Sequence, residues 1–261
     1  MRDVPFRGKL RLLGAFVPRS GEKTARIFGY NVKLDLADDI HRWIYLGCYE
    51  PEETALLREH LKPGMNFLDV GANIGYFTLL AASIVGPSGR IFSVEPSPAC
   101  STRLAESVQA NGIKNVRIER MGLSDQPGTS VLHIPRAEDR NHTPSMISWN
   151  EGESTSIEVP VRTLDAMIEE WGIDTIDVMK IDVEGYEPTI FRGASHALAS
   201  GRIKAILCEF NAYYLEAAGS STRDLYDTLI NAGFYDVNPT SFREDAPLQT
   251  QFFKRSGDKA P

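Results

Sequence analysis

The stretch 66–78 constrains the fold of this chain more than any other part of the sequence. It begins with a mainly apolar run, Asn66–Val70, and passes through a turn bounded by Gly71 and Gly75. An apolar helical pattern then follows over Phe77–Ile84. Such a run is typical of a central parallel strand that is covered on both faces. The pattern therefore predicts a strand, a tight turn and a helix whose free N–H groups face a ligand crevice at the carboxyl edge of a sheet.

The glycine turn predicts a particular class of ligand. Its spacing is Gly71-x-x-x-Gly75, with Asn73 in the middle and Asp69 two residues before the first glycine. It thus differs from the dinucleotide pattern G-x-G-x-x-G. A carboxylate beside the turn suits a cationic amino group, whereas a pyrophosphate favours bare N–H groups. We therefore expect S-adenosylmethionine rather than NAD, bound by these four residues. The spacing resembles motif I of the class I methyltransferases.

Composition limits the partners that we expect. The 261 residues are 42% hydrophobic and 24% charged, which suits one large α/β domain. A net charge of −7 disfavours a general attraction to nucleic acid or anionic membranes. Three widely spaced cysteines form neither a disulfide framework nor a zinc pattern, and we see no signal peptide and no apolar run long enough to span a membrane. These features predict a cytoplasmic protein, and the sequence leaves its oligomeric state open.

Strand and helix patterns alternate after the glycine turn, which predicts a doubly wound, mostly parallel sheet. The further strands expected are 90–95, 116–119, 176–182, 203–210, 234–237 and 248–253, of which the last two form an antiparallel hairpin. A helix is expected over 187–200.

Three segments surround this alternating pattern. An N-terminal extension holds a β-hairpin within 26–47 and a helix from Pro51 to about Leu61. Short alternating runs over about 129–161 predict an inserted hairpin. The boundaries that we expect are 1–62 for the extension, 63–255 for the main domain with its insertion, and 256–261 for a frayed tail.

Two strand ends supply further candidate ligand contacts. Glu95 ends the second strand and is followed by Pro96, at the position where an acid hydrogen-bonds both hydroxyls of a ribose. Gly122 and Leu123 follow the third strand. We expect them at the adenine edge of the cofactor.

A second motif, Met179–Glu187, places Asp182 and Glu184 where the fourth strand leaves the sheet, directly beside the first. A carboxylate at that point faces the methyl donor, the acceptor hydroxyl or a bound cation. The alternative is that Asp182 only caps a helix and that the glutamates are solvated.

Taken together, the spaced motifs resemble the FkbM family of S-adenosylmethionine-dependent methyltransferases. The runs that carry the resemblance are Gly47–Glu50, Asp69–Thr78, Glu95–Pro96, Lys180–Glu187 and Phe191–Ala194. The resemblance implies a class I methyltransferase (Rossmann-like) fold, with a seven-stranded mostly parallel sheet, and O-methylation of a hydroxyl on a small molecule, sugar, lipid or polyketide-like acceptor. It also implies that Tyr49 and Glu50 lie beside the methionine end of the cofactor.

Residues after the fourth strand favour O-methylation. Many N-methyltransferases carry an Asn/Asp-Pro-Pro-aromatic loop there, but this chain has Asp182-Val183-Glu184-Gly185. A carboxylate suits a hydroxyl, whose proton must leave as the new bond forms. An N-methyltransferase on the same fold and an idle cofactor-binding or scaffold protein remain the alternatives.

Two devices for removing the proton fit the sequence. In the first, Asp182 or His142 in the inserted loop accepts it, with Glu184 close by. In the second, a divalent cation such as Mg²⁺ lowers the pKa of the acceptor. Its ligands would be Asp182, Glu209 and Asn211, since adjacent strands lie only ~4.8 Å apart.

Overall fold

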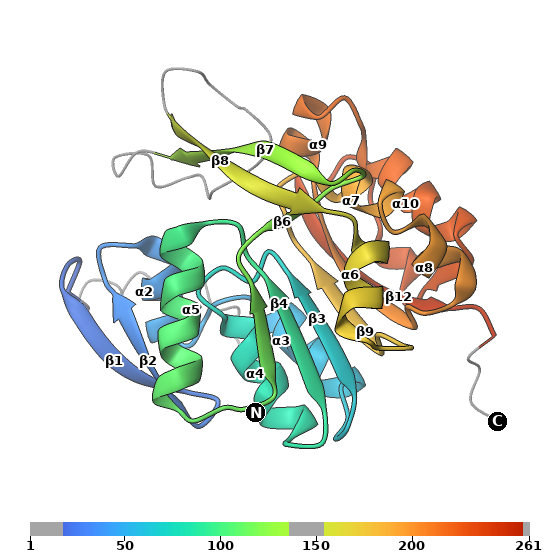
Figure 1. Cartoon of the computed structure of the whole chain (residues 1–261). Coiled ribbons are helices and arrows are strands. Elements are labelled where there is room, and N and C mark those ends of the chain that lie inside the picture. Colours follow the sequence, from blue (N-terminus) through green and yellow to red (C-terminus); the bar gives the residue numbers. More distant parts are fainter. Residues whose placement is uncertain (1–17, 136–153, 258–261) are drawn as a thin grey trace, which may run out of the picture.

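A computed structural model describes residues 18–135 and 154–257, and a seven-stranded sheet forms its centre (Figure 1). Its strands are β3 (Asn66–Val70), β4 (Arg90–Val94), β5 (Val116–Glu119), β9 (Val178–Ile181), β10 (Ala205–Asn211), β11 (Phe234–Asp236) and β12 (Leu248–Arg255). Their order is β11-β12-β10-β9-β3-β4-β5. Only β12 runs antiparallel to its neighbours. The predicted α/β fold with a mostly parallel sheet is confirmed.

Helices cover both faces of this sheet (Figure 1). They are α3 (Pro51–His60), α4 (Tyr76–Val85), α5 (Pro98–Ala110), α6 (Leu164–Trp171), α7 (Glu187–Arg192), α8 (Ser195–Ser200), α9 (Ala212–Ala217) and α10 (Thr222–Asn231). The central strand β3 is buried on both sides, because Phe67 packs toward α3 and α4 while Leu68 and Val70 pack toward α6, α7, α8 and α10. Among the described residues, no helix is long and apolar enough to cross a membrane.

The N-terminal hairpin lies earlier than the sequence suggested. Strands β1 (Glu22–Ile27) and β2 (Tyr30–Asp35) pair over their whole length, and residues 39–45 form a helix, α2 (Asp39–Tyr45). The expected range 26–47 was therefore wrong at both ends. The error arose because the alternating apolar and polar pattern continues past the hairpin, although a helix begins after Asp38. Asp38 caps this helix, since its carboxylate accepts the backbone N–H of His41.

The predicted insertion contains the expected hairpin. Strands β7 (Gly128–Pro135) and β8 (Ser154–Arg162) pair antiparallel, and β8 also pairs with the short β6 (Gly122–Leu123). The expected helix 187–200 is two helices, α7 and α8, which break at Gly193. A Cβ at Gly193 would lie 2.0 Å from the backbone oxygen of Ser124, so the chain is pressed against the β6 turn at this point.

Candidate functional site

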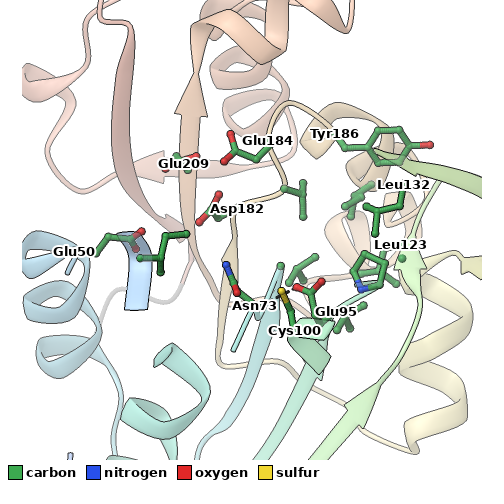
Figure 2. Close-up of a pocket in the computed structure, with 18 of the residues that line it drawn as sticks. Glu50, Asn73, Glu95, Cys100, Leu123, Leu132, Asp182, Glu184, Tyr186 and Glu209 are labelled. Carbon is green, nitrogen blue, oxygen red and sulfur yellow. Dashed lines mark hydrogen bonds between the residues drawn. The ribbon is translucent and has the colours of Figure 1, made fainter. Parts of the chain in front are cut away.

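A cavity of about 250 Å³ opens at the carboxyl ends of β3, β4, β9 and β10 (Figure 2). It lies where the strand order reverses between β3 and β9, the position at which open α/β sheets bind ligands. Most of the residues predicted from sequence line it. They are Tyr49, Glu50, Gly71, Asn73, Glu95, Pro96, Gly122, Leu123, Asp182, Glu184 and Glu209.

Four predicted residues are not in this lining. The Asp69 side chain is fully buried under the turn, where it accepts the hydroxyl of Thr78 at 2.6 Å, and burial raises its pKa. Gly75 is the N-cap residue that precedes α4, and a Cβ there would lie 2.3 Å from Leu104. Both residues therefore stabilise the conformation of the glycine turn and do not line the cavity. Asn211 is also absent from the lining, and His142 lies outside the described residues.

Gly71 is required by a close approach of two backbone segments. Its φ is +78°, and a Cβ there would lie 1.9 Å from the backbone oxygen of Asp182. Asp182 in turn donates its N–H to Val70 at 3.1 Å. The glycine turn after β3 and the acidic loop after β9 are thus locked side by side.

Glu95 is poised for a ligand that donates hydrogen bonds. The residue is 6% exposed, and its carboxylate accepts the backbone N–H groups of Asn73 and Ser97, both at 2.8 Å. Burial raises the pKa of Glu95 to about 7. Each oxygen keeps a further lone pair, so the residue fits the two hydroxyls of a ribose in S-adenosylmethionine.

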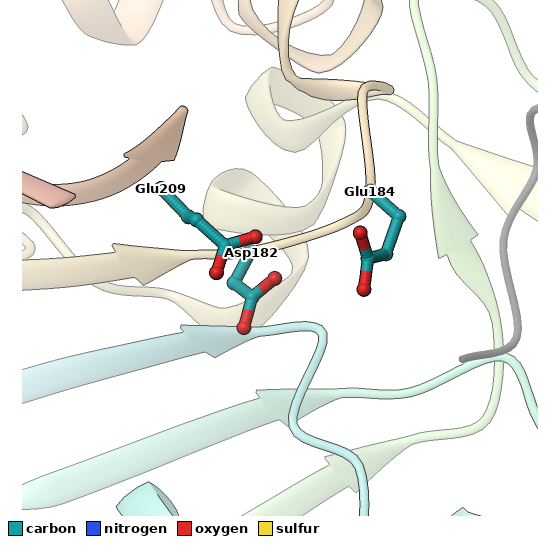
Figure 3. Close-up of side chains that lie close together, drawn as sticks. All are labelled: Asp182, Glu184 and Glu209. Atoms are coloured by element: carbon teal, nitrogen blue, oxygen red, sulfur yellow. The ribbon is translucent and has the colours of Figure 1, made fainter. Parts of the chain in front are cut away.

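Three carboxylates converge at another side of the cavity (Figure 3). Asp182, Glu184 and Glu209 each offer an oxygen that lies within 4.8 Å of the other two. Asn211 lies beside this group, and its Nδ2 donates to Glu184 Oε2 at 3.0 Å. Of the predicted set Asp182, Glu209 and Asn211, the first two lie in this group and Glu184 offers the third oxygen, while the involvement of Asn211 stays a prediction.

A buried lysine sets the charges in this carboxylate group. Lys180 Nζ lies 2.7 Å from Asp182 Oδ2 and 4.8 Å from the ring centre of Phe77. Burial alone would raise the pKa of Asp182, but the Lys180 ammonium outweighs burial and holds that pKa below its usual range. For Glu209, burial and then the Asp182 charge raise the pKa well above its usual range. These pKa shifts favour the ionised form of Asp182 and the neutral form of Glu209.

Tyr49 and Glu50 line the cavity from the turn before α3, and Figure 2 shows Glu50 at this side. Burial raises the pKa of Glu50 to about 7, with Lys180 acting in the opposite direction. Burial and the neighbouring Glu50 raise the pKa of Tyr49 well above its usual range. Both residues thus favour their neutral forms more than they would in water.

Strained backbone is concentrated around this cavity. Among the described non-glycine residues, four have a positive φ: Phe28, Glu50, Asn73 and Glu184. All but Phe28 line the cavity. Such conformations persist where the surroundings over-determine them, and they gather at functional sites.

Sequence reasoning missed the apolar part of the wall. Leu132 of the inserted hairpin, Ile190 of α7 and Ile40 of α2 all face the cavity, as do Cys100 and Tyr186. Tyr186 Oη lies 3.2 Å from the hydroxyl of Ser124. Tyr186 belongs to the same sequence motif as Asp182, and that position could have identified it as a lining residue. Leu132, Ile190, Ile40 and Cys100 belong to elements in which no motif indicated the face that points to the cavity.

Comparison with known proteins identifies the family. A family model described as "Methyltransferase FkbM domain" matches residues 69–235. The chain is 30% identical over 168 residues to the hexuronic acid methyltransferase AglP of Haloferax volcanii, covering 62% of this chain and 63% of that protein. It is 25% identical over 155 residues to the 2-O-methyltransferase NoeI of Sinorhizobium fredii, covering 54% and 62%. Plant and fungal methyltransferases match over 38–66% of their own length.

A solved structure supports the fold. The METTL16 methyltransferase domain superposes with a TM-score of 0.50 at 13% identity, covering 87% of this chain and 74% of that one. The family model spans well over half of the chain and includes both the glycine turn and the acidic loop. The protein therefore belongs to the FkbM family of methyltransferases.

Proposed function

We propose that the protein transfers a methyl group from S-adenosylmethionine to a hydroxyl oxygen of a small-molecule, sugar, lipid or polyketide-like acceptor. The observation that carries this proposal is the convergence of Asp182, Glu184 and Glu209 on one cavity that also contains Glu95. The names of two relatives support it, since one acts on a hexuronic acid and the other is a 2-O-methyltransferase.

The cofactor-binding part of the proposal rests on the turn after β3 and the end of β4. Glu95 would accept both ribose hydroxyls, with Gly71 and Asn73 forming the cradle beside it. Pro96, Gly122 and Leu123 would line the adenine edge, and Tyr49 and Glu50 the methionine end.

The acceptor oxygen would attack in line with the carbon–sulfur bond. S-adenosylmethionine supplies a methyl group that its sulfonium already activates, so the protein must mainly align the partners, which is worth about 7–11 kcal/mol. A carbon–oxygen bond forms, the carbon–sulfur bond breaks and the sulfur keeps the electron pair. The hydroxyl proton passes to the Asp182 carboxylate, which Lys180 keeps ionised, while Glu184 and Glu209 orient the acceptor.

As the alternative to proton transfer to Asp182, we propose that Asp182, Glu184 and Glu209 hold a divalent cation such as Mg²⁺. Three carboxylate oxygens form the hard donor set that such ions prefer. The cation would lower the pKa of the acceptor hydroxyl. Chelation with EDTA should then abolish turnover, Mg²⁺ should restore it, and Glu184→Ala should weaken Mg²⁺ binding in calorimetry. Full turnover after thorough chelation would remove the cation from the proposal.

An acceptor panel tests the reaction itself. The protein is incubated with methyl-labelled S-adenosylmethionine and with neutral sugars, hexuronates, hydroxylated lactones and amines, and the methylated atom is located by mass spectrometry and NMR. A methyl ether is the expected product. Label on nitrogen would favour an N-methyltransferase, and tight binding of S-adenosylhomocysteine without turnover of any acceptor would favour an idle binder.

A matched pair of variants tests the proton acceptor. Asp182→Asn should lower kcat by about 100-fold or more, as loss of a general base does. Asp177→Asn is the control, because Asp177 precedes the same strand at the opposite edge of the sheet, where it accepts the N–H of Asn66 at 2.7 Å. Equal losses in the two variants would show that Asp182 acts only through folding.

A further inference from the structure

The loop that presents Asp182 and Glu184 to the cavity has an unusual backbone. Glu184 has a φ of +53° and Gly185 a φ of +88°, so two successive residues lie in the left-handed region. A Cβ at Gly185 would lie 2.5 Å from the backbone oxygen of Tyr214, which fixes the path of the loop against α9. A glutamate in this conformation needs neighbours that hold it there.

Glu187 holds the loop from below. It lies in the first turn of α7, is 2% exposed and is not in the cavity lining. Its Oε1 accepts the backbone N–H of Val183 at 3.0 Å, directly between Asp182 and Glu184. Its Oε2 is buried and has no hydrogen-bond partner among the described residues. A buried oxygen without a partner is costly, so the contact of Glu187 with the Val183 N–H is kept in spite of that cost.

The second contact comes from β10. Asn211 Nδ2 donates to Glu184 Oε2 at 3.0 Å and so directs the Glu184 carboxylate. The two contacts act on different parts of the loop, since Glu187 binds its backbone and Asn211 binds its side chain. Together with the Lys180–Asp182 pair at 2.7 Å, they leave the acidic loop little freedom.

We propose that Glu187 is a positioning residue, which holds the Val183 N–H so that Glu184 keeps its left-handed backbone and its carboxylate faces Asp182 and Glu209. The importance of Glu187 for turnover rests on the proposed function of these carboxylates. Its effect on the loop does not.

The chain offers a matched control in Asp236. This residue is also a buried carboxylate, 6% exposed, whose Oδ1 accepts a backbone N–H, that of Asn238, at 2.8 Å. Its Oδ2 likewise has no partner among the described residues. Asp236 lies at the end of β11 and is not in the cavity lining. Replacing it therefore reports the cost of losing such a carboxylate away from the site.

The experiment compares Glu187→Gln, Glu187→Leu and Asp236→Leu. We measure hydrogen exchange of the Val183 amide relative to that of Leu68 in the central strand, the unfolding midpoint, and kcat and KM. Glu187→Leu should accelerate Val183 exchange about tenfold because its N–H loses its acceptor. It should also lower kcat about 100-fold through misplaced carboxylates. Glu187→Gln keeps a carbonyl acceptor and should restore both to within a few-fold, while Asp236→Leu should lower only the midpoint.

Two results would overturn the proposal. One is a Glu187→Leu variant whose Val183 amide exchanges like the wild type, relative to Leu68. The other is accelerated exchange with an unchanged kcat, which would make the contact merely structural. If the wild type methylates no acceptor, the proposed function fails, but the exchange comparison still decides whether Glu187 holds the loop.

Discussion

Replacing Glu95 with alanine or glutamine gives the sharpest test of the cofactor site. Its carboxylate already accepts two backbone N–H groups at 2.8 Å and keeps a lone pair on each oxygen for a ribose hydroxyl. A hydrogen bond to a charged group contributes about 1.5–3 kcal/mol. Loss of two such bonds in Glu95→Ala should therefore weaken S-adenosylhomocysteine binding by at least about 3 kcal/mol, or about 100-fold in Kd.

Glu95 should also make cofactor binding depend on pH. Burial raises the pKa of Glu95 to about 7 in the free protein, whereas donors from ribose hydroxyls favour the ionised form. The protein must therefore release a proton to bind the cofactor below pH 7. Affinity should rise between pH 6 and pH 8, by up to about tenfold per pH unit below the pKa. Glu95→Gln has no such proton and should flatten this rise, leaving only the part that Glu50 contributes, whose pKa is also about 7.

Titration calorimetry with S-adenosylhomocysteine at pH 6, 7 and 8 measures both effects. The matched control is Glu119→Gln, since Glu119 ends the neighbouring strand β5 but is not in the cavity lining and accepts the indole N–H of Trp171 at 2.9 Å. Glu119→Gln should bind like the wild type at every pH. Wild-type affinity and an unaltered pH profile in Glu95→Gln would refute the ribose assignment.

Two further predictions concern stability. Gly71→Ala should lower the free energy of unfolding by more than about 3 kcal/mol or prevent folding, because its Cβ would lie 1.9 Å from the backbone oxygen of Asp182. The control is Gly112→Ala, since Gly112 has a φ of +63° and open space around it. In thermal unfolding this control should lose only about 1–2 kcal/mol of stability. The free energy of unfolding of the free protein, measured with urea, should fall between pH 5 and pH 8, because the folded state retains protons that the unfolded state has lost. The fall should reach up to about 1.4 kcal/mol per group and pH unit. A flat profile would contradict this expectation. Burial raises the pKa of the responsible groups to about 7, 7 and 8, for Glu50, Glu95 and Glu187 respectively.

The sheet and one edge of the site were predictable because parallel strands impose simple rules. Alternation of strand and helix predicts their direction, and parallel strands end at a common edge. Residues at strand ends, such as Glu95 and Asp182, therefore had to come together, and both line the cavity. The order β9-β3-β4 explains why the turn after β3 faces the loop after β9.

Side-chain direction was harder to predict. Asp69 lies in a buried strand, where successive side chains point to opposite faces, and it points with Phe67 toward α4 instead of into the crevice. Asn211 lies at the carboxyl end of β10, where a ligand contact was expected, yet its amide Nδ2 donates a hydrogen bond to Glu184. Leu132 reaches the cavity only because the β7–β8 hairpin folds over it. Each of these outcomes depends on packing between segments that are distant in the sequence.

The strained residues show why the site cannot be separated from the fold. A left-handed backbone costs about 1–3 kcal/mol at a non-glycine residue, and three such residues line the cavity. Asn73 is held there while its N–H binds Glu95, and Glu184 while its carboxylate binds Asn211. At Asn73 one contact therefore engages the strained backbone and directs the Glu95 carboxylate, whereas at Glu184 the neighbouring Val183 N–H binds Glu187 and the carboxylate binds Asn211. Relaxing the strain with glycine at position 73 or 184 should then favour folding locally, yet loosen the groups that face the ligand, so stability and ligand affinity are expected to move in opposite directions.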